Sequence, residues 1–414
     1  MFLLDYEIKE ISSSVIVLEN KIDTNITCIE LDDSIIFVDS GSRDDIAKNF
    51  REEMERRFQK KTSHLILTHY HWDHFGGMSS FRDVEIIGAK SGFKEFEQSL
   101  NGELTKERRI AAVIQNKENV KKGIWEETER TKIFYEYYPK MEIFLPSKTK
   151  DNLKISSGKN EVIFNVIGGH TKCSAYIYIP FEKILIVGDN LASDTSQLGQ
   201  CYFRSLNKET IGILEELEKL DFDVVIPGHG PIVDSSYVTR SKEYLSELFF
   251  TLEKIARNEV KPSELKKDHP DLPIYFDGQF PDYWNIVLKR LYGAISLEIY
   301  GKEIDKKKER IIKALIEGNR EFLINLRTID LEDMFPNGSF VQGLEDYKQQ
   351  IFFWKIHEGR YETLERYFFG DKIVERCYYI YKSTADSKEL RREYIYYWKK
   401  VDNEWKISSQ IRLS

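Results

Sequence analysis

The feature that most constrains this 414-residue chain is a dense run of polar side chains directly after a short apolar segment. Residues 64–67 form an apolar run of the kind that becomes a buried strand. A protein core buries many polar groups only when they have partners, and imidazole and carboxylate together suit zinc and related divalent ions. The run therefore indicates a metal site at a strand end rather than a polar loop. Its candidate ligands are His69, His71, Asp73 and His74.

One loop at a strand end can aim His69 and His71 at one point and Asp73 and His74 at another, so it can serve two ions. Closing either site requires ligands from elsewhere in the chain. Three candidates follow later predicted strands, where a side chain can project into a cleft, and each lies beside glycines that permit tight turns. They are His170 in Gly-Gly-His-Thr, Asp189 in Gly-Asp-Asn and His229 in Gly-His-Gly.

Short strands and helices alternate on both sides of this cluster. A strand-rich set precedes it and a second set follows it, and each set is accompanied by a helical segment. Two such halves predict stacked sheets with outer helices. We expect strands at 15–18, 26–31, 34–38, 64–67, 161–167, 175–179, 184–187 and 224–226, and helices at 44–60 and 208–220.

A largely helical insertion at about residues 91–140 separates the two halves and is rich in aromatic side chains. Their default role is packing, and the alternative is a cap that faces a substrate. Tyr70 and Trp72 of the cluster have the same two interpretations. The aromatic residues of the insertion are Phe93, Phe96, Trp125, Phe134, Tyr135, Tyr137 and Tyr138.

The character of the chain changes near residue 300. Helical periodicity dominates from Tyr237 to about Tyr300, with an interruption over 261–281, and then helices are followed by aromatic-rich strands. We therefore expect two domains, residues 1–300 and a smaller α+β domain at 301–414. In the second domain we expect helices at 306–326 and 343–355, and strands at 373–382, 393–401 and 405–413.

The motifs HYHWDH, GGHT, GDN and GHG, in this order between repeated strand sets, make residues 1–300 resemble the metallo-β-lactamase superfamily. The resemblance implies an α/β fold, the four-layer αββα sandwich, with metals at one edge of the sheets. It implies that Asp189 bridges two metal ions. It also implies that His69, His71 and His170 bind one ion and that Asp73, His74 and His229 bind the other.

Other polar residues stay outside this ligand set. Asp39 occupies a place where the family commonly has an acidic residue that supports the metal loop, and its alternative is an ordinary strand-ending turn. His64, His269 and His357 match no ligand position, so we interpret them as structural or surface residues.

The resemblance further implies a zinc-dependent, binuclear hydrolase in which the two divalent ions activate a bridging hydroxide, with iron or manganese as alternative metals. Asp73 and Asp189 are the candidate catalytic residues, because either could orient that hydroxide or relay a proton to the leaving group. True β-lactamases of the superfamily generally have cysteine or serine where Asp189 stands. The favoured substrate is a small thioester, ester or lactone in a pocket shaped by the insertion, and the alternative is a phosphodiester.

Two other functional classes stay open. The C-terminal pattern is similar to that of SnoaL-like, cystatin-type α+β cone domains, which often enclose small molecules or form dimers. The chain could therefore be a metal-stabilised binding or sensing protein, with a homodimer formed through residues 301–414. An iron redox protein is disfavoured by His71, because flavodiiron proteins have glutamate there.

Composition sets expectations for partners and compartment. The net charge of −8, without a long basic run, disfavours nucleic acid and favours a small-molecule substrate. Neither a signal peptide nor an apolar stretch of membrane-spanning length is expected. Four widely spaced cysteines without a CxxC pair fit a reduced cytoplasm. They are Cys28, Cys173, Cys201 and Cys377.

Overall fold

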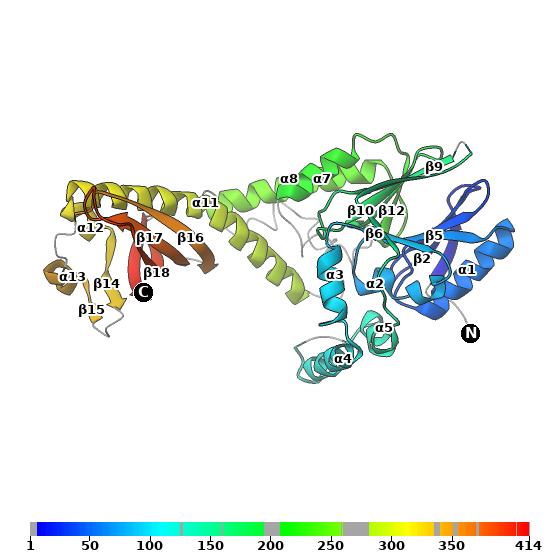
Figure 1. Ribbon diagram of the computed structural model, residues 1–414, viewed down its shortest axis with the longest axis horizontal. Coiled ribbons are helices and arrows are strands. Elements are labelled where there is room, and N and C mark those ends of the chain that lie inside the picture. Colours follow the sequence, from blue (N-terminus) through cyan, green and yellow to red (C-terminus); the bar gives the residue numbers. More distant parts are fainter. Residues whose placement is uncertain are drawn as a thin grey trace. The chain divides into compact units, whose positions relative to one another are not determined.

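The chain divides into two compact units in the computed structural model, and each is described by itself (Figure 1). The first unit comprises Met1–Thr251 with Ser263–Leu288, and the second comprises Leu252–Pro262 with Lys289–Ser414. Residue 300, where the sequence suggested a boundary, lies inside one continuous helix, α11 (Pro281–Glu317). The structure describes residues 6–124, 127–158, 160–193, 208–257, 259, 281–334, 340–350, 355–369, 372–402 and 404–413.

The first sheet of the first unit is antiparallel from β1 to β4 and parallel from β4 to β7. Strand alternation sorts its side chains. Val15 and Val17 face the second sheet, whereas Ile16 and Leu18 face the helices. In chain order the strands are β1 (Tyr6–Glu10), β2 (Val15–Asn20), β3 (Ile26–Glu30), β4 (Ile35–Val38), β5 (Thr62–Ile66), β6 (Glu85–Ala89) and β7 (Lys148–Lys150).

The second sheet has the order β13-β12-β11-β10-β9-β8, with β11 and β12 parallel and the other pairs antiparallel. Phe164, Ile177 and Ile186 fill the space between the two sheets. The strands are β8 (Asn152–Ser157), β9 (Asn160–Val166), β10 (Ala175–Ile179), β11 (Ile184–Ala192), β12 (Val224–His229) and β13 (Val233–Asp234).

Helices cover the outer faces of both sheets, which confirms the αββα sandwich (Figure 1). The helix α1 (Asp44–Phe58) packs on the first sheet, where Phe50 meets Phe37 edge-on at 5.7 Å between ring centroids. Phe37 is fully buried, so its truncation to alanine would cost about 3–5 kcal/mol. The helices α7 (Lys208–Leu217) and α8 (Ser236–Ala256) lie beside the second sheet.

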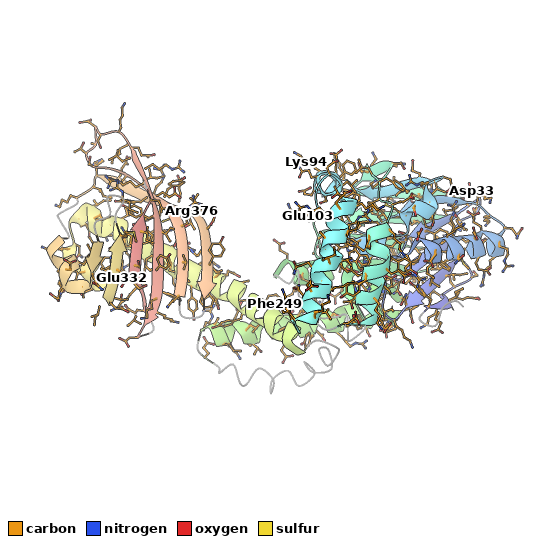
Figure 2. The ribbon with its side chains drawn as sticks, turned by 90° about the horizontal axis from the view of Figure 1, so that it is seen from below. Asp33, Lys94, Glu103, Phe249, Glu332 and Arg376 are labelled. Atoms are coloured by element: carbon orange, nitrogen blue, oxygen red, sulfur yellow. The ribbon has the colours of Figure 1, made fainter. Side chains whose placement is uncertain are left out.

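The insertion is helical, as expected. Figure 2 shows the exposed Lys94 and Glu103 projecting from it. Trp125 lies outside the described residues. The helical segments from the ligand run to the end of the insertion are α2 (Trp72–Phe75), η1 (Met78–Phe81), α3 (Phe93–Leu100), α4 (Lys106–Lys121), α5 (Glu129–Tyr137) and η2 (Tyr138–Lys140).

Aromatic side chains of the insertion pack on the run that carries the ligands. The Trp72 ring meets Phe134 and Tyr138 edge-on, each at 5.5 Å between centroids, and these two rings stack on each other at 4.7 Å. The Tyr70 ring stacks on Phe96 at 4.4 Å. These contacts support the packing interpretation for the aromatic residues concerned.

The second unit is an α+β domain in which α11 packs against a sheet with the order β15-β14-β19-β18-β17-β16. Tyr300 and Ile304 of α11 share a core with Trp398 and Trp405 of the sheet. Figure 2 labels Glu332 and Arg376 on two of its strands. The strands are β14 (Arg327–Met334), β15 (Phe340–Gln342), β16 (Glu358–Phe369), β17 (Lys372–Lys382), β18 (Leu390–Val401) and β19 (Glu404–Arg412).

The helix expected at 306–326 is two helices. The first, α11, ends at Glu317 because Gly318 has a left-handed φ of 75°, which glycine adopts without strain. Asn319 then caps α12 (Arg320–Asn325) by accepting a hydrogen bond from the Phe322 N–H at 3.1 Å. The helix expected at 343–355 is described as α13 (Leu344–Gln350).

None of the helices in the described ranges combines the length and apolar character that a membrane crossing requires. Cys28, Cys173 and Cys377 are buried free thiols. Cys201, His269 and the interruption at 261–280 lie outside the described residues.

Candidate metal centre

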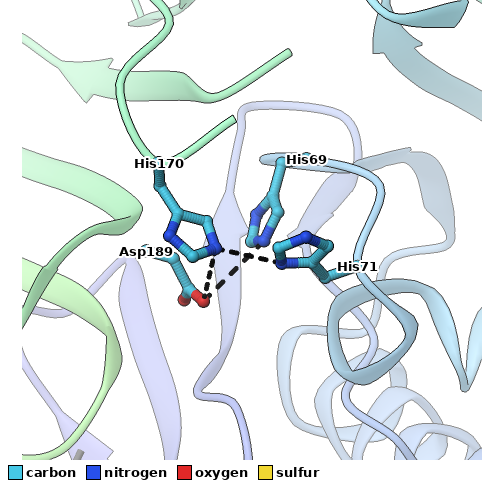
Figure 3. Close-up of side chains that lie close together, drawn as sticks. All are labelled: His69, His71, His170 and Asp189. Carbon is cyan, nitrogen blue, oxygen red and sulfur yellow. Dashed lines mark hydrogen bonds and ion pairs between the residues drawn. The ribbon is translucent and has the colours of Figure 1, made fainter. Parts of the chain in front are cut away.

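Two neighbouring groups contain all seven side chains that the sequence nominated as ligands. In each group the ligand atoms lie within 4.8 Å of one another. The first group, shown in Figure 3, consists of His69, His71, His170 and Asp189. The second group consists of Asp73, His74 and His229.

Four segments of the backbone carry these residues. The loop after β5 carries His69 and His71 and leads into α2, which carries Asp73 and His74. His170 lies in the loop between β9 and β10. The sequence placed Asp189 and His229 just beyond strand ends, which is wrong in detail. Asp189 lies within β11 and His229 is the last residue of β12, because the parallel pairing of these strands continues through irregular register shifts.

The carboxylate of Asp189 faces both groups. Its Oδ2 lies 3.5 Å from His170 Nε2 and 3.8 Å from His69 Nε2. Its Oδ1 lies 3.0 Å from His74 Nε2 and 3.5 Å from His229 Nε2. One oxygen therefore serves each group, which is the arrangement that a bridging carboxylate requires.

Glycine at position 228 makes room for this carboxylate. A Cβ added to Gly228 would lie 2.2 Å from Asp189 Oδ1 and 2.8 Å from the backbone of Gly188. Both distances are shorter than real Cβ contacts, so any side chain at position 228 would displace Asp189.

The donor atoms fit a divalent cation. Nε2 of His69, His74 and His229 and Oδ1 of Asp189 are buried without a well-formed hydrogen bond. Buried polar atoms of this kind are rare without a partner, and imidazole nitrogen with carboxylate oxygen is a donor set typical of zinc and related ions. The geometry thus suits cations in both groups.

Groups behind the ligands fix their orientation. Asp39 Oδ2 lies 2.7 Å from His74 Nδ1, and its two oxygens accept hydrogen bonds from the Thr68 N–H and Oγ1. The Asp23 carbonyl lies 3.2 Å from His229 Nδ1. Both histidines therefore direct Nε2 into the second group.

Asp39 has a left-handed φ of 57°, which is uncommon for a residue other than glycine. Its contacts to Thr68 and His74 hold it in this conformation. Of the two interpretations from the sequence, the structure favours support of the ligand loop.

A family model described as the Metallo-beta-lactamase superfamily matches residues 21–229. The chain belongs to this superfamily. Curated relatives include the "Metallo-beta-lactamase type 2" proteins of Bacillus cereus and Elizabethkingia meningoseptica. The first is 24% identical over 216 residues, which cover 51% of this chain and 68% of the relative. The second is 24% identical over 217 residues, which cover 51% and 71%.

Similar solved structures have comparable names. A metallo-beta-lactamase from Pontibacter korlensis has 17% sequence identity and a TM-score of 0.42, covering 58% of this chain and 99% of that chain. One from Hirschia baltica has 17% identity and a TM-score of 0.40, covering 58% and 98%.

In this superfamily member, burial and neighbouring charges lower the pKa values of His69 and His71 and raise those of His74 and His229. Burial, with a contribution from His74, keeps the pKa of His69 well below its ordinary value, and burial beside His170 lowers the pKa of His71 to about 4. Burial also opposes charge on His74, but the carboxylates of Asp189 and Asp39 outweigh it and raise its pKa well above the ordinary value.

The same balance applies to His229. Burial acts against its charged form, yet the negative charge of Asp189 raises its pKa to about 9. Burial disfavours ionised Asp189, but the charges of His74 and His229 hold its pKa well below the usual range. In the metal-free second group these shifts favour protonated imidazole and ionised carboxylate.

Arg130 is one of two residues at this centre that the sequence did not reveal. Its Nη2 lies 2.7 Å from Asp73 Oδ2. Burial favours neutral Asp73, but the guanidinium charge outweighs it and keeps the pKa of Asp73 well below its ordinary range. Arg130 lies 57 positions after Asp73 in the sequence, so no motif links the two residues.

Asn190 was also missed, although it follows Asp189 directly. Its Oδ1 accepts a hydrogen bond from the His170 N–H at 2.8 Å, and its Nδ2 donates to the Gly168 carbonyl at 3.0 Å. Asn190 thus fixes the loop that carries His170.

The described histidines outside the ligand set belong to neither group. His64 Nδ1 lies 2.8 Å from Ser63 Oγ, and its Nε2 lies 3.5 Å from Glu85. His357 is exposed in the second unit.

Proposed function

We propose that this chain is a binuclear metal-dependent hydrolase that cleaves a small thioester, ester or lactone. Membership of the superfamily and the two ligand groups support a metal-dependent hydrolase. The observation that carries the binuclear proposal is Asp189, because one of its carboxylate oxygens faces each group. Zinc is the favoured metal and iron or manganese the alternative, since histidine and aspartate accept all three.

The proposed chemistry rests on two divalent cations. When bound, they would act as Lewis acids and lower the pKa of a coordinated water to about 7. Within this proposal, His69, His71 and His170 hold one cation, and Asp73, His74 and His229 hold the other. Asp189 joins the two groups.

The chain's own carboxylates supply the remaining steps. Asp73 and Asp189 are buried carboxylates within the two ligand groups, so either can orient the attacking water and relay its proton. The accepted proton then passes to the leaving group. Asp39 and Asn190 do not take part directly, because they hold His74 and the His170 loop in place.

A carbonyl substrate is favoured over a phosphodiester polymer because the chain has a net charge of −8. The second candidate is β-lactam hydrolysis, which the names of the curated relatives favour. The aromatic rings of the insertion that pack on Trp72 are engaged with one another, so they contribute less to substrate contact than the sequence suggested.

The test combines elemental analysis with a hydrolysis screen of thioesters, lactones, phosphodiesters and β-lactams. We expect two zinc equivalents per chain and turnover of one carbonyl class. Asp189→Asn should lose turnover, whereas His64→Gln, a histidine variant outside both groups, should retain it. Protein that retains no metal and gives no turnover after metal loading would contradict the proposal.

A binding or sensing protein would behave differently. It would retain ligand affinity after alanine substitution of Asp73 and Asp189, and it would have no hydrolytic activity to lose. Oxygen or nitric oxide consumption by iron-loaded protein would instead favour the redox class.

For the second unit, the SnoaL-like proposal is supported by α11 packing against a sheet, and an open surface pocket of about 480 Å³ lies beside Lys308, Arg360 and Tyr361. We propose that this unit binds a small molecule or forms the homodimer. Light scattering on the full chain should give twice the monomer mass if it dimerises. The buried free thiols agree with the proposed cytoplasmic location.

A further inference from the structure

Arg130 contacts the oxygen through which Asp73 would bind a cation. Its guanidinium Nη2 lies 2.7 Å from Asp73 Oδ2. The same oxygen lies 3.2 Å from His229 Nε2, so it is the oxygen that faces the second group. A positive side chain and a cation of the second group would therefore share one carboxylate oxygen.

Helix stability does not account for a cation at this position. Arg130 is the second residue of α5, and the first turn of a helix carries partial positive charge that disfavours a cationic side chain. Thr128 caps the helix, and Thr128 and Thr131 form reciprocal hydrogen bonds that fix the first turn. The contact with Asp73 is an interaction that stabilises the guanidinium there.

The insertion is also fastened to the ligand run. Trp72 immediately precedes Asp73, and its ring packs on Phe134 of α5 and Tyr138 of η2. Arg109 of α4 donates a hydrogen bond to the Tyr138 carbonyl at 2.7 Å. The Arg130 side chain is 24% exposed while that of Asp73 is 5% exposed, so the guanidinium closes the outer side of a buried carboxylate.

We propose that Arg130 weakens cation binding by the second group, so that the two groups bind their ions with unequal affinity. This inference rests on the binuclear site of the proposed function. A cation at Asp73 would lie about 2 Å from the oxygen that Arg130 contacts. Two like charges would then lie within about 5 Å of each other in a buried place where screening is poor.

The first group has a different set of neighbours. Its ion pairs join His69 and His170 to the carboxylate of Asp189. A cation at His69 or His71 would therefore not compete directly with Arg130, whose ion pair is with Asp73. The charge of Arg130 acts selectively because Asp73 belongs to the second group alone.

The test is a calorimetric titration of metal-free full-length protein with Zn²⁺, with bound zinc counted by elemental analysis. In the wild type we expect two binding steps of unequal Kd. Arg130→Met, which keeps an unbranched side chain about as long as the arginine alkyl stem but removes the guanidinium and its charge, should tighten the weaker step by roughly tenfold or more. The tighter step should change by less than about twofold.

Two variants serve as controls. Arg130→Lys keeps the charge and should leave the weaker step near its wild-type Kd. Arg108→Met removes an exposed arginine from α4 of the same insertion and should change neither step. His229→Gln should abolish the weaker step, which assigns it to the second group. If Arg130→Met does not fold, Arg130→Gln removes the charge while keeping a hydrogen-bond donor.

Each outcome has a defined meaning. A weaker step that is unchanged or loosened by Arg130→Met would overturn the inference, because Arg130 would then be positioning Asp73 as a ligand. Two steps of equal Kd in the wild type would also overturn it. Failure of the wild type and all variants to bind any zinc would instead overturn the proposed function itself.

Discussion

The two ligand groups of the first unit lie side by side, but their surroundings shift the histidine pKa values in opposite directions. In the first group, the pKa values of His69 and His71 are lowered by burial, so these imidazoles are neutral and ready to bind a cation. In the second group, Asp189 raises the pKa values of His74 and His229 against the effect of burial. The same residue types thus acquire different roles from their neighbours.

This difference in pKa changes which protons and side chains a cation must displace when it binds to each group. A cation entering the first group meets the neutral nitrogen atoms of His69 and His71 and the carboxylate of Asp189. A cation entering the second group must release protons from His74 and His229 and compete with Arg130 at Asp73. Charge in the surroundings, rather than ligand identity alone, therefore sets the cost of loading each group.

Substitution of Asp189 should have the largest effect, because this residue is what joins the groups. Asp189→Ala should lose both ions and reduce kcat/KM by roughly a thousandfold. Elemental analysis and steady-state kinetics measure the two effects. Retention of two zinc ions by this variant would contradict a bridging role.

Substitution of one histidine in each group should show which zinc-binding step belongs to which group. His170→Ala should abolish the tighter zinc-binding step, and His229→Ala should abolish the weaker one, leaving one ion per chain in each case. Zinc titration followed by elemental analysis distinguishes the two. If either substitution removes both ions, the groups are not independent.

The stability of the metal-free protein should depend on pH in opposite directions for the two groups. The pKa of His229 is raised from 6.5 to about 9, so its stabilising effect is complete below pH 6.5 and is lost as the pH rises through 9. The pKa of His71 is lowered from 6.5 to about 4, so stability is lost as the pH falls from 6.5 toward 4. Each effect is on the order of 3 kcal/mol.

Urea unfolding in the presence of a chelator measures this dependence. His229→Gln should flatten the alkaline side of the stability profile and His71→Gln the acidic side. The matched control is His357→Gln, which replaces an exposed histidine and should change neither side. An unchanged alkaline side in His229→Gln would contradict the charged state assigned to the second group.

The smallest of these effects should come from the support behind the second group. Asp39→Asn keeps the shape that Thr68 contacts but removes the charge beside His74 Nδ1. Zinc affinity of the second group should fall by roughly 10–100-fold, with little change in the first. Calorimetry measures both steps, and equal losses in the two would show that Asp39 acts on the whole loop.

The sequence nominates the candidate ligands because they are concentrated in the chain, and the structure brings all seven together. The run from His69 to His74 holds four of them, and the other three lie beside glycines that follow predicted strands. Local density of this kind is visible without any tertiary information. The support by Asp39 was left open, because its geometry depends on a left-handed φ that an isolated aspartate does not reveal.

Several strands were not predicted because pairing, rather than local pattern, determines them. β16 has the sequence EGRYETLERYFF, whose charged residues do not alternate cleanly with apolar ones, and it forms by pairing along its length with β17. β8 and β1 are similar edge strands. Arg130 escaped prediction for the same reason, since its contact with Asp73 exists only once the insertion is packed on the ligand run.

The position of Trp72 has a consequence for attempts to redesign this enzyme. Trp72 separates a ligand of the first group, His71, from a ligand of the second, Asp73, and its ring is the surface on which the insertion rests. The insertion therefore cannot be replaced without changing the packing around the ligand run. An insertion grafted from another chain would need a matching residue at position 72. In laboratory evolution, substitutions in the insertion would have to preserve metal binding before they could change the range of substrates.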